Sequence, residues 1–143
     1  MELIVKEFSH LSGRELYEIL QARAEIFMIE QGIHYQDLDD TDYSAVHCFL
    51  WENDTVLGYF RAFYADDTKK TVKIGRVLTR THGQGHGRLL MEKGMAALSA
   101  LMPYERILIH AQTHAEGFYK KLGFATTSAV FEEAGIPHVT MEL

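Results

Sequence analysis

The chain has 143 residues, of which 47% are hydrophobic and 24% are charged, and its net charge is −6 at pH 7. These values predict one folded domain over residues 1–143 and exclude a disordered chain or a non-specific nucleic-acid binder, which needs a broad basic surface. The longest apolar run is too short for a membrane span, and residues 1–10 lack the features of a signal peptide. With Cys48 as the lone cysteine, we expect a cytoplasmic protein.

Residues 1–79 predict a strand, a helix and three further strands in sequence. Residues 2–8 begin with an apolar run, and Ser12 to Glu15 have the spacing of a capping box for a helix that ends near Glu30. A polar, acid-rich loop follows. The hairpin-connected strands are predicted at residues 46–51, 55–64 and 72–79.

Residues 80–143 predict two more helices and three more strands. After a glycine-rich loop come a helix at residues 88–100, an apolar strand at 106–111 and a helix at 115–122 that Gly123 ends. Two last strands, at 124–131 and 138–143, flank a turn at 132–137. This order of elements predicts a mixed α/β sheet.

The charges are unevenly distributed along the chain. Residues 1–68 carry 4 Lys or Arg and 14 Asp or Glu, whereas residues 69–143 carry 10 and 6. Seven of the basic residues lie within residues 69–93, which contain a single acid, Glu92. Such a basic stretch is consistent with a site for a small anionic ligand, or with an ordinary solvated surface.

The glycine-rich loop lies inside this basic stretch and reads His82-Gly83-Gln84-Gly85-His86-Gly87. Glycines tolerate positive φ and let backbone amides approach a ligand, and a helix N-terminus attracts anions. Arg80 and Arg88 can add charge-assisted hydrogen bonds to a diphosphate. The loop does not match the P-loop or the dinucleotide fingerprint. It predicts a phosphate cradle, with a tight turn before a helix as the alternative.

A second motif lies about 25 residues beyond the loop, between Leu108 and Phe124. It contains Gln112, Ala115 and the sequence Phe118-Tyr119-Lys120-Lys121-Leu122-Gly123-Phe124. Together the two motifs resemble the GCN5-related N-acetyltransferase (GNAT) family, with His82 where that family has Gln or Arg. The resemblance extends to the family's ElaA-type branch at Arg23, Phe27, Glu30, Gln31, Tyr35, Gln36, Gly75, Arg76 and residues 133–138.

The resemblance implies an acyl-CoA N-acyltransferase fold, in which helices flank a mixed, mostly antiparallel sheet with splayed fourth and fifth strands. It implies an N-acetyltransferase that moves an acetyl group from acetyl-coenzyme A (acetyl-CoA) to a primary amine by direct attack in a ternary complex. The residues expected to bind acetyl-CoA are Val77, Leu78, Thr79, His82, Gly83, Gln84, Gly85, His86, Gly87, Arg88, Gln112 and Tyr119.

The resemblance assigns Tyr119 as the acid that protonates the leaving thiolate. Three side chains, Glu30, His114 and His138, are candidates for the general base, and an ordered water is the alternative. Residues expected to shape the pocket of the amine are Tyr35, Gln36, Arg76 and His138. Cys48 is expected in the core rather than as a nucleophile.

No metal is expected, because neither histidine pair spaced by four residues lies on one helix face. The expected partner is a small-molecule or peptide amine, with no nucleic acid and no membrane, and the resemblance also allows a homodimer. A non-catalytic module that binds acyl-CoA as a sensor is the alternative function.

Overall fold

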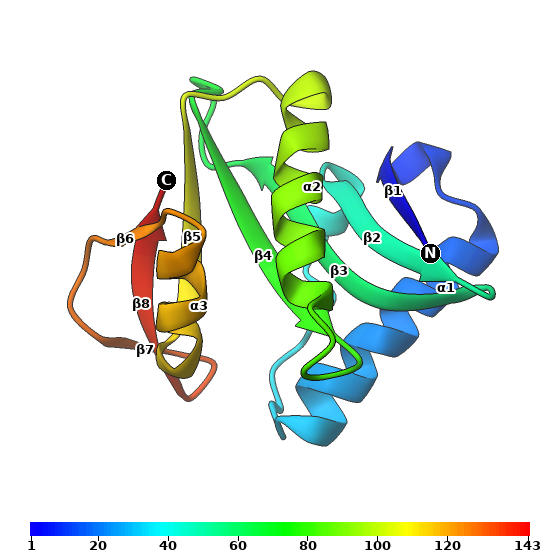
Figure 1. Ribbon diagram of the computed structural model, residues 1–143, viewed down its shortest axis with the longest axis horizontal. Coiled ribbons are helices and arrows are strands. Elements are labelled where there is room, and N and C mark those ends of the chain that lie inside the picture. The colour runs from blue at the N-terminus through cyan, green and yellow to red at the C-terminus, as the bar shows by residue number, and fades with distance from the viewer.

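The computed structural model describes residues 1–143, which form one eight-stranded sheet with helices on both faces (Figure 1). The strands are β1 (Glu2–Glu7), β2 (Val46–Glu52), β3 (Thr55–Tyr64), β4 (Thr71–Thr79), β5 (Arg106–Gln112), β6 (Ala125–Thr126), β7 (Phe131–Glu133) and β8 (Ile136–Glu142). The helices are α1 (Gly13–Arg23), the π-helical η2 (Ala24–Glu30), α2 (His86–Leu101), α3 (Glu116–Lys121) and the short 3-10 turns η1 (Phe8–His10), η3 (Thr41–Tyr43) and η4 (Thr113–Ala115). None of the helices is long and apolar enough to span a bilayer.

The sheet is mixed but mostly antiparallel. Its strand order is β1-β2-β3-β4-β5-β8-β6, and β7 pairs with β8 outside this path. Only the β4–β5 pair is parallel, whereas every other neighbouring pair is antiparallel. The predicted fold, a mixed and mostly antiparallel sheet between helices, is therefore confirmed.

Strands β4 and β5 separate along their length, as predicted. Their pairing begins at Thr71↔Arg106 and ends at Ile74↔Ile109. Just beyond this point β4 contains a bulge, where the register skips Phe60 of β3 and Arg76 adopts a φ of +55°. A bulge inserts an unpaired residue and bends its strand. Figure 1 shows β4 and β5 side by side at one end and apart at the other.

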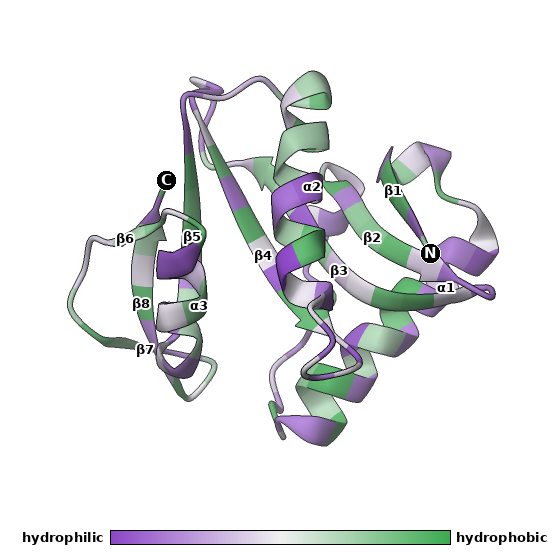
Figure 2. Ribbon diagram, in the orientation of Figure 1, coloured by the Kyte–Doolittle hydropathy of each residue, from purple (hydrophilic) through white to green (hydrophobic).

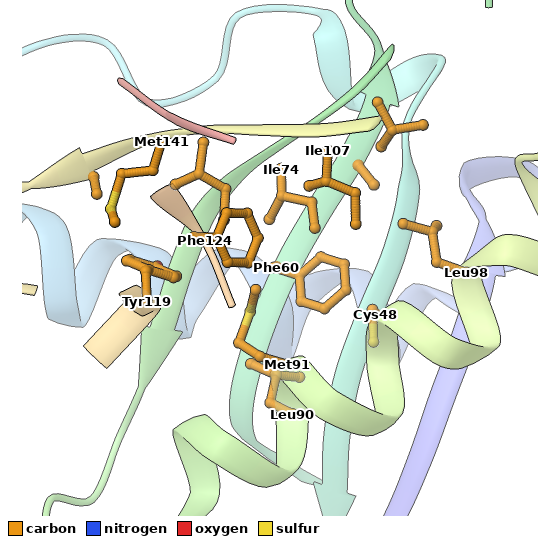
Figure 3. Packing of buried hydrophobic residues seen from close by; sticks show 14 of the residues in the cluster. Cys48, Phe60, Ile74, Leu90, Met91, Leu98, Ile107, Tyr119, Phe124 and Met141 are labelled. Atoms are coloured by element: carbon orange, nitrogen blue, oxygen red, sulfur yellow. The ribbon is translucent and has the colours of Figure 1, made fainter. Parts of the chain in front are cut away.

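Two hydrophobic clusters hold the helices on opposite faces of the sheet. The larger, with 18 buried residues, packs α2 and α3 on one face and includes Phe60, Met91 and Phe124 (Figure 3). The smaller, with 7 buried residues, packs Ile19 and Ala22 of α1 on the other. Figure 2 shows that the loop between β4 and α2 is hydrophilic. The loop therefore lies outside both clusters.

The N-terminal helical region confirms the predicted capping box and differs in its last turns. The Ser12 hydroxyl accepts a hydrogen bond from the amide of Glu15, whose carboxylate accepts one from the amide of Ser12. The helix continues to Glu30, as predicted, but residues 24–30 are π-helical. Helical periodicity does not distinguish these two forms over one or two turns.

The C-terminal strands differ from the prediction. Of the predicted strand at residues 124–131, only the two residues of β6 and Phe131 are in strands. The predicted turn at 132–137 instead contains the rest of β7 and the start of β8. The turn itself is only Ala134-Gly135, where φ is +53° and +74°. Two successive residues with positive φ make a tight hairpin turn. The sequence did not predict this turn because alanine rarely adopts a positive φ.

Candidate functional site

A cleft of about 430 Å³ lies where β4 and β5 separate. One wall is β4 from Lys73 to Val77, and the other is β5 from Ile109 to Gln112 with η4 and Tyr119 of α3. The loop after η2 and the β7–β8 hairpin also contribute side chains. Because the strands are no longer paired here, the edge of β4 that faces β5 has backbone groups free for a ligand.

Tyr119 is the buried phenol of this cleft. Its side chain is 5% exposed and packs edge-on against the rings of Phe118 and Phe124, with centroid distances of 5.1 and 5.7 Å. Figure 3 shows it at one end of the larger core cluster. Burial raises the pKa of Tyr119 well above its ordinary value of 10. The phenol is therefore protonated at neutral pH and can donate a hydrogen bond into the cleft.

The cleft contains eight of the residues predicted from the sequence. They are Tyr35, Gln36, Arg76, Val77, Gln112, His114, Tyr119 and His138. Leu78 is 4% exposed, and its side chain packs in the cluster beneath α1. Leu78, Thr79, Glu30 and residues 82–88 lie outside the lining.

The glycine loop lies at the C-terminal end of β4, where α2 begins. Gly83 and Gly85 have φ values of +74° and +75°, and a Cβ atom at either would point into open space. Gly85 caps α2 without any side-chain hydrogen bond, which leaves amides of the first turn free. A Cβ at Gly87 would lie 3.4 Å from the Phe118 ring, so this glycine allows α2 to begin close to α3.

The arginines beside the loop already have acidic partners in the chain. Arg88 donates a hydrogen bond of 2.8 Å to Glu92. The Nε of Arg80 lies 2.9 Å from Glu25 of η2, but this N–H does not point along the contact, so the pair is ionic without being a hydrogen bond. A phosphate ligand would compete with these carboxylates for both guanidinium groups.

Glu30 and His82, two predicted site residues, contact each other. The Nε2 of His82 lies 3.3 Å from Oε1 of Glu30, and both side chains are largely exposed. This contact joins the end of η2 to the glycine loop. It places Glu30 beside the predicted phosphate cradle rather than in the cleft.

Three arginines hold the acid-rich loop in place as a wall of the cleft. Arg23 is fully buried and donates to Asp37 (2.8 Å) and Asp42 (2.7 Å). Arg61 donates to Asp39 through both terminal nitrogens at 2.7 Å, and Arg76 donates to Asp37 at 2.8 Å. The charges of these three aspartates are therefore balanced by three arginines, although the loop is rich in acidic residues.

These contacts shift the pKa values of two of the aspartates. Hydrogen bonds from Arg61 hold the pKa of Asp39 far below its ordinary value of 3.8. Burial would raise the pKa of Asp42, but hydrogen bonds and positive charge from Arg23 and Arg61 outweigh it and lower this pKa as well. Both carboxylates are therefore ionised throughout the neutral pH range.

A group of polar side chains lines the opposite side of the cleft, in which the predicted residues Gln112, His114 and His138 are joined by two that the sequence assigned no role in the site, His110 and Glu133. The Nδ1 of His110 lies 2.9 Å from Oε1 of Glu133, whose Oε2 lies 3.7 Å from Nε2 of His138. His114 lies 2.7 Å from Gln112, which donates to Gln31. Glu133 and His110 are 23 positions apart, so only the register of β5, β8 and β7 reveals that they meet.

Cys48 does not add a second reactive group to the cleft. Cys48 is fully buried on β2, and burial raises the pKa of its thiol to about 12. This confirms its predicted place in the core, where it cannot reach a substrate. No group of three or more His, Cys, Asp or Glu side chains is placed to hold a metal ion.

A family model and an individual relative both match this chain over most of its length. Residues 16–143 match the sequence model of the acetyltransferase (GNAT) domain. The protein ElaA of Escherichia coli (strain K12) is 36% identical over 137 residues, which cover 93% of this chain and 90% of ElaA.

Two solved structures share the fold over nearly their whole length. The crystal structure of Escherichia coli ElaA gives a TM-score of 0.90 at 34% identity and covers 99% of this chain and 97% of that one. An acyl-CoA N-acyltransferase from Pseudomonas aeruginosa gives a TM-score of 0.90 at 31% identity, with 99% of each chain covered.

Proposed function

The chain belongs to the GNAT acetyltransferase family, and on this premise we propose that it transfers an acetyl group from acetyl-CoA to a primary amine. The observation that carries this proposal is the cleft between β4 and β5, which holds the buried phenol of Tyr119. In this proposal both substrates are bound together, and the amine attacks the acetyl carbon directly.

The open edge of β4 and the glycine loop fit the two ends of acetyl-CoA. Its pantetheine arm carries amides, which can pair with the backbone of Val77 to Thr79 as an added strand would. Its diphosphate matches the free amides at the N-terminus of α2 and the open space beside Gly83 and Gly85. Acetyl-CoA supplies the activated thioester, and the chain supplies the binding surface and the proton donor.

The bulge in β4 supports a backbone amide as the group that stabilises negative charge on the acetyl oxygen. Two residues, Arg76 and Val77, fill the place opposite Phe60, so one of their backbone groups lacks a partner in β3. Val77 lines the cleft. An amide of Val77 or Leu78 that points into the cleft would act as an oxyanion donor, a contribution of about 3 kcal/mol in other acyl transfers.

Tyr119 is the proposed donor to the sulfur atom as the carbon–sulfur bond breaks. A free thiol has an ordinary pKa of about 8.5, lower than that of a phenol, so proton transfer in water would be unfavourable. Burial raises the pKa of a thiol as it does that of a phenol, so we expect the thiolate that leaves within the cleft to be more basic than in water. A phenol held next to it can then donate its proton as the carbon–sulfur bond breaks.

Removal of the Tyr119 hydroxyl tests this proposal. In a thiol-release assay with acetyl-CoA and a panel of primary amines, we expect turnover by the wild type and a kcat roughly 100-fold lower in Tyr119→Phe. Phenylalanine keeps the ring contacts of Tyr119 with Phe118 and Phe124, so we expect the melting temperature to be nearly unchanged.

The control is Tyr104→Phe, which removes another partly buried phenol and is expected to keep wild-type activity. Acetyl-CoA binding without turnover of any amine would refute the proposal and favour a non-catalytic sensor. Equal activity of Tyr119→Phe and the wild type would remove Tyr119 from the mechanism.

A further inference from the structure

Strands β5, β8 and β7 bring a set of polar side chains to one face of the sheet. Gln112 pairs with His138 across β5 and β8, and Phe131 pairs with His138 across β7 and β8. Because side chains alternate between faces, His110 shares the face of Gln112, and Glu133 shares the face of Phe131. This face is opposite the one whose side chains, such as Ala111 and Val139, form the larger core cluster.

The hydrogen bonds on this face fix which atoms carry protons. A carboxylate oxygen only accepts, so the Nδ1 of His110 donates to Glu133 Oε1 at 2.9 Å. A carbonyl oxygen also only accepts, so the Nδ1 of His138 donates to the carbonyl of Ile136 at 2.7 Å. In the neutral imidazole of His138, Nε2 is therefore the unprotonated nitrogen.

While His138 is neutral, two acceptor atoms on this face have no donor within the chain. The Nε2 of His138 lies 3.7 Å from Oε2 of Glu133, which is too long for a hydrogen bond, and neither atom carries a proton. Phe131 packs against both imidazoles, with ring centroids 5.2 Å from His110 and 6.1 Å from His138. The His138 side chain is only 8% exposed, so its position is well defined by the packing.

We propose that Glu133 Oε2 and His138 Nε2 bind the acceptor as its ammonium ion, and that His138 Nε2 then removes a proton to free the attacking lone pair. This inference rests on the proposed acetyl transfer. An alkyl amine has a pKa of about 10.4 and enters the cleft protonated. One –NH₃⁺ group has three donors and can bond to both acceptors at about 2.9 Å each.

One turnover moves three protons within the cleft. His138 Nε2 takes one proton from the ammonium ion, and the resulting lone pair forms a bond to the acetyl carbon. The carbon–sulfur bond then breaks, and the sulfur takes the proton of Tyr119. The nitrogen loses a second proton as the amide forms, and this one restores the phenol through solvent. The proton on His138 is released, so each turnover gives an amide, a free thiol and one proton.

The other two candidate bases are less suitably placed. Glu30 contacts His82 and lies outside the cleft lining. His114 lines the cleft, and its Nε2 donates to Oε1 of Gln112 at 2.7 Å, which leaves only its Nδ1 as a base. Unlike His138, His114 has no carboxylate beside it to bind the ammonium ion. Gln112 in turn donates to Gln31. This chain of hydrogen bonds positions Gln112 and His114 against the loop after η2.

The structure also defines which charged and titratable side chains surround His138. Glu133 is the charged group in direct contact with it, and a carboxylate there stabilises the imidazolium that forms. The other titratable or charged side chains that line the cleft are Tyr35, Asp37, Asp39, Arg61, Lys73, Arg76, His110, His114 and Tyr119.

Two substitutions separate binding of the ammonium ion from removal of its proton. Glu133→Gln keeps an oxygen acceptor for His110 but loses the charge, so we expect the KM for the amine to rise at least about 10-fold while the KM for acetyl-CoA is unchanged. His138→Gln loses the base, so we expect kcat to fall roughly 100-fold. The pH–rate profile of the wild type should contain a rising limb that His138→Gln lacks.

The control variants make the same two substitutions, Glu to Gln and His to Gln, at exposed positions outside the cleft. Glu132→Gln changes the adjacent exposed glutamate, and His10→Gln changes an exposed histidine of η1. Both are expected to keep wild-type kinetics. A long-range ¹H–¹⁵N NMR spectrum gives a readout independent of activity, since it should show the neutral His138 ring protonated at Nδ1.

Failure of this inference can be distinguished from failure of the proposed function. If amines are acetylated but His138→Gln and Glu133→Gln keep wild-type kinetics and pH dependence, the inference is wrong and the function stands. A neutral His138 protonated at Nε2 would also overturn it. If no amine is acetylated by the wild type, both fall together.

Discussion

At Gly94, helix α2 packs directly against side chains of the sheet. A Cβ atom there would lie 2.6 Å from a ring carbon of Phe60 and 2.8 Å from the sulfur of Cys48, both fully buried. Alanine normally stabilises a helix by about 1 kcal/mol relative to glycine. At Gly94 the overlap with a packed core outweighs that gain.

We therefore predict that Gly94→Ala lowers the free energy of unfolding by about 1–3 kcal/mol, measured by urea denaturation. The matched variant is Gly117→Ala in α3, where nothing lies within 4 Å of the added atom. That change should raise stability by about 0.5–1 kcal/mol. If the two variants shift stability in the same direction, close packing at Gly94 is not its role.

At the residue scale, the sequence predicted side chains that belong to short local motifs. Tyr119 and the glycine loop lie in such motifs, and the resemblance assigned them roles from the residues alone. Glu133 and His110 could not be found in this way, because their contact depends on the register of three strands. Glu30 was predicted as a candidate base from its position at the end of a helix. That position does not reveal its contact with His82.

The loop of residues 31–45 is held in its conformation mainly by ion pairs. Its short 3-10 turn is its only regular structure, and the contacts of Asp37, Asp39 and Asp42 with three arginines hold it against the sheet. Asp42 is the most buried of the three, and it bonds to both Arg23 and Arg61. Removal of its charge leaves buried guanidinium groups with fewer partners.

We predict that Asp42→Asn lowers the free energy of unfolding by about 3 kcal/mol. Asp40→Asn is the matched control, because Asp40 is exposed and its φ of +65° suits asparagine equally well. The control should change stability by less than about 0.5 kcal/mol. Equal effects of the two substitutions would show that the ion pairs do not stabilise the loop.

The same loop predicts the response to acid. The pKa values of Asp39 and Asp42 are lowered in the folded protein, so their contribution is complete above the unfolded pKa of about 4. It is lost as the pH falls from about 4 toward the folded pKa values. Stability should therefore fall more steeply with acid in the wild type than in Asp42→Asn, and parallel curves would contradict this origin.

At the element scale, helices were better predicted than the last strands. The capping box fixed the start of α1, and the apolar face and Pro103 bounded α2 to within two residues. The C-terminal hairpin was misjudged because Ala134 adopts a conformation usually reserved for glycine or asparagine. The sequence also predicted Pro137 as part of a turn, although this residue lies in β8 and is paired with Glu132 of β7.

The whole molecule consists of two parts of one sheet that diverge from a short shared segment. Strands β4 and β5 pair only over Thr71–Ile74, and the cleft opens beyond it. The pattern of each strand alone predicts its presence but not where it leaves its neighbour, so this feature came from the family resemblance. A ligand that fills the space between the strands should stabilise both parts together.

We predict that saturating acetyl-CoA raises the melting temperature, by an amount that corresponds to about 2.7 kcal/mol at 100 times the Kd. Gly85→Ala should reduce this shift, because its Cβ points into the open space beside the free amides of α2. Gly32→Ala introduces a similar backbone strain at a φ of +64° away from the loop and should keep the full shift. An equal loss in both variants would argue against a phosphate site at the loop.

The most direct test of the account is mass spectrometry of one reaction that contains the protein, acetyl-CoA and a primary amine. Direct transfer within the cleft predicts that the amine gains an acetyl group while the chain stays unmodified, and that initial rates give intersecting double-reciprocal lines. An acetyl group on the chain as an intermediate, with parallel lines, would contradict direct attack. Failure of every amine to gain an acetyl group would contradict the proposed activity itself.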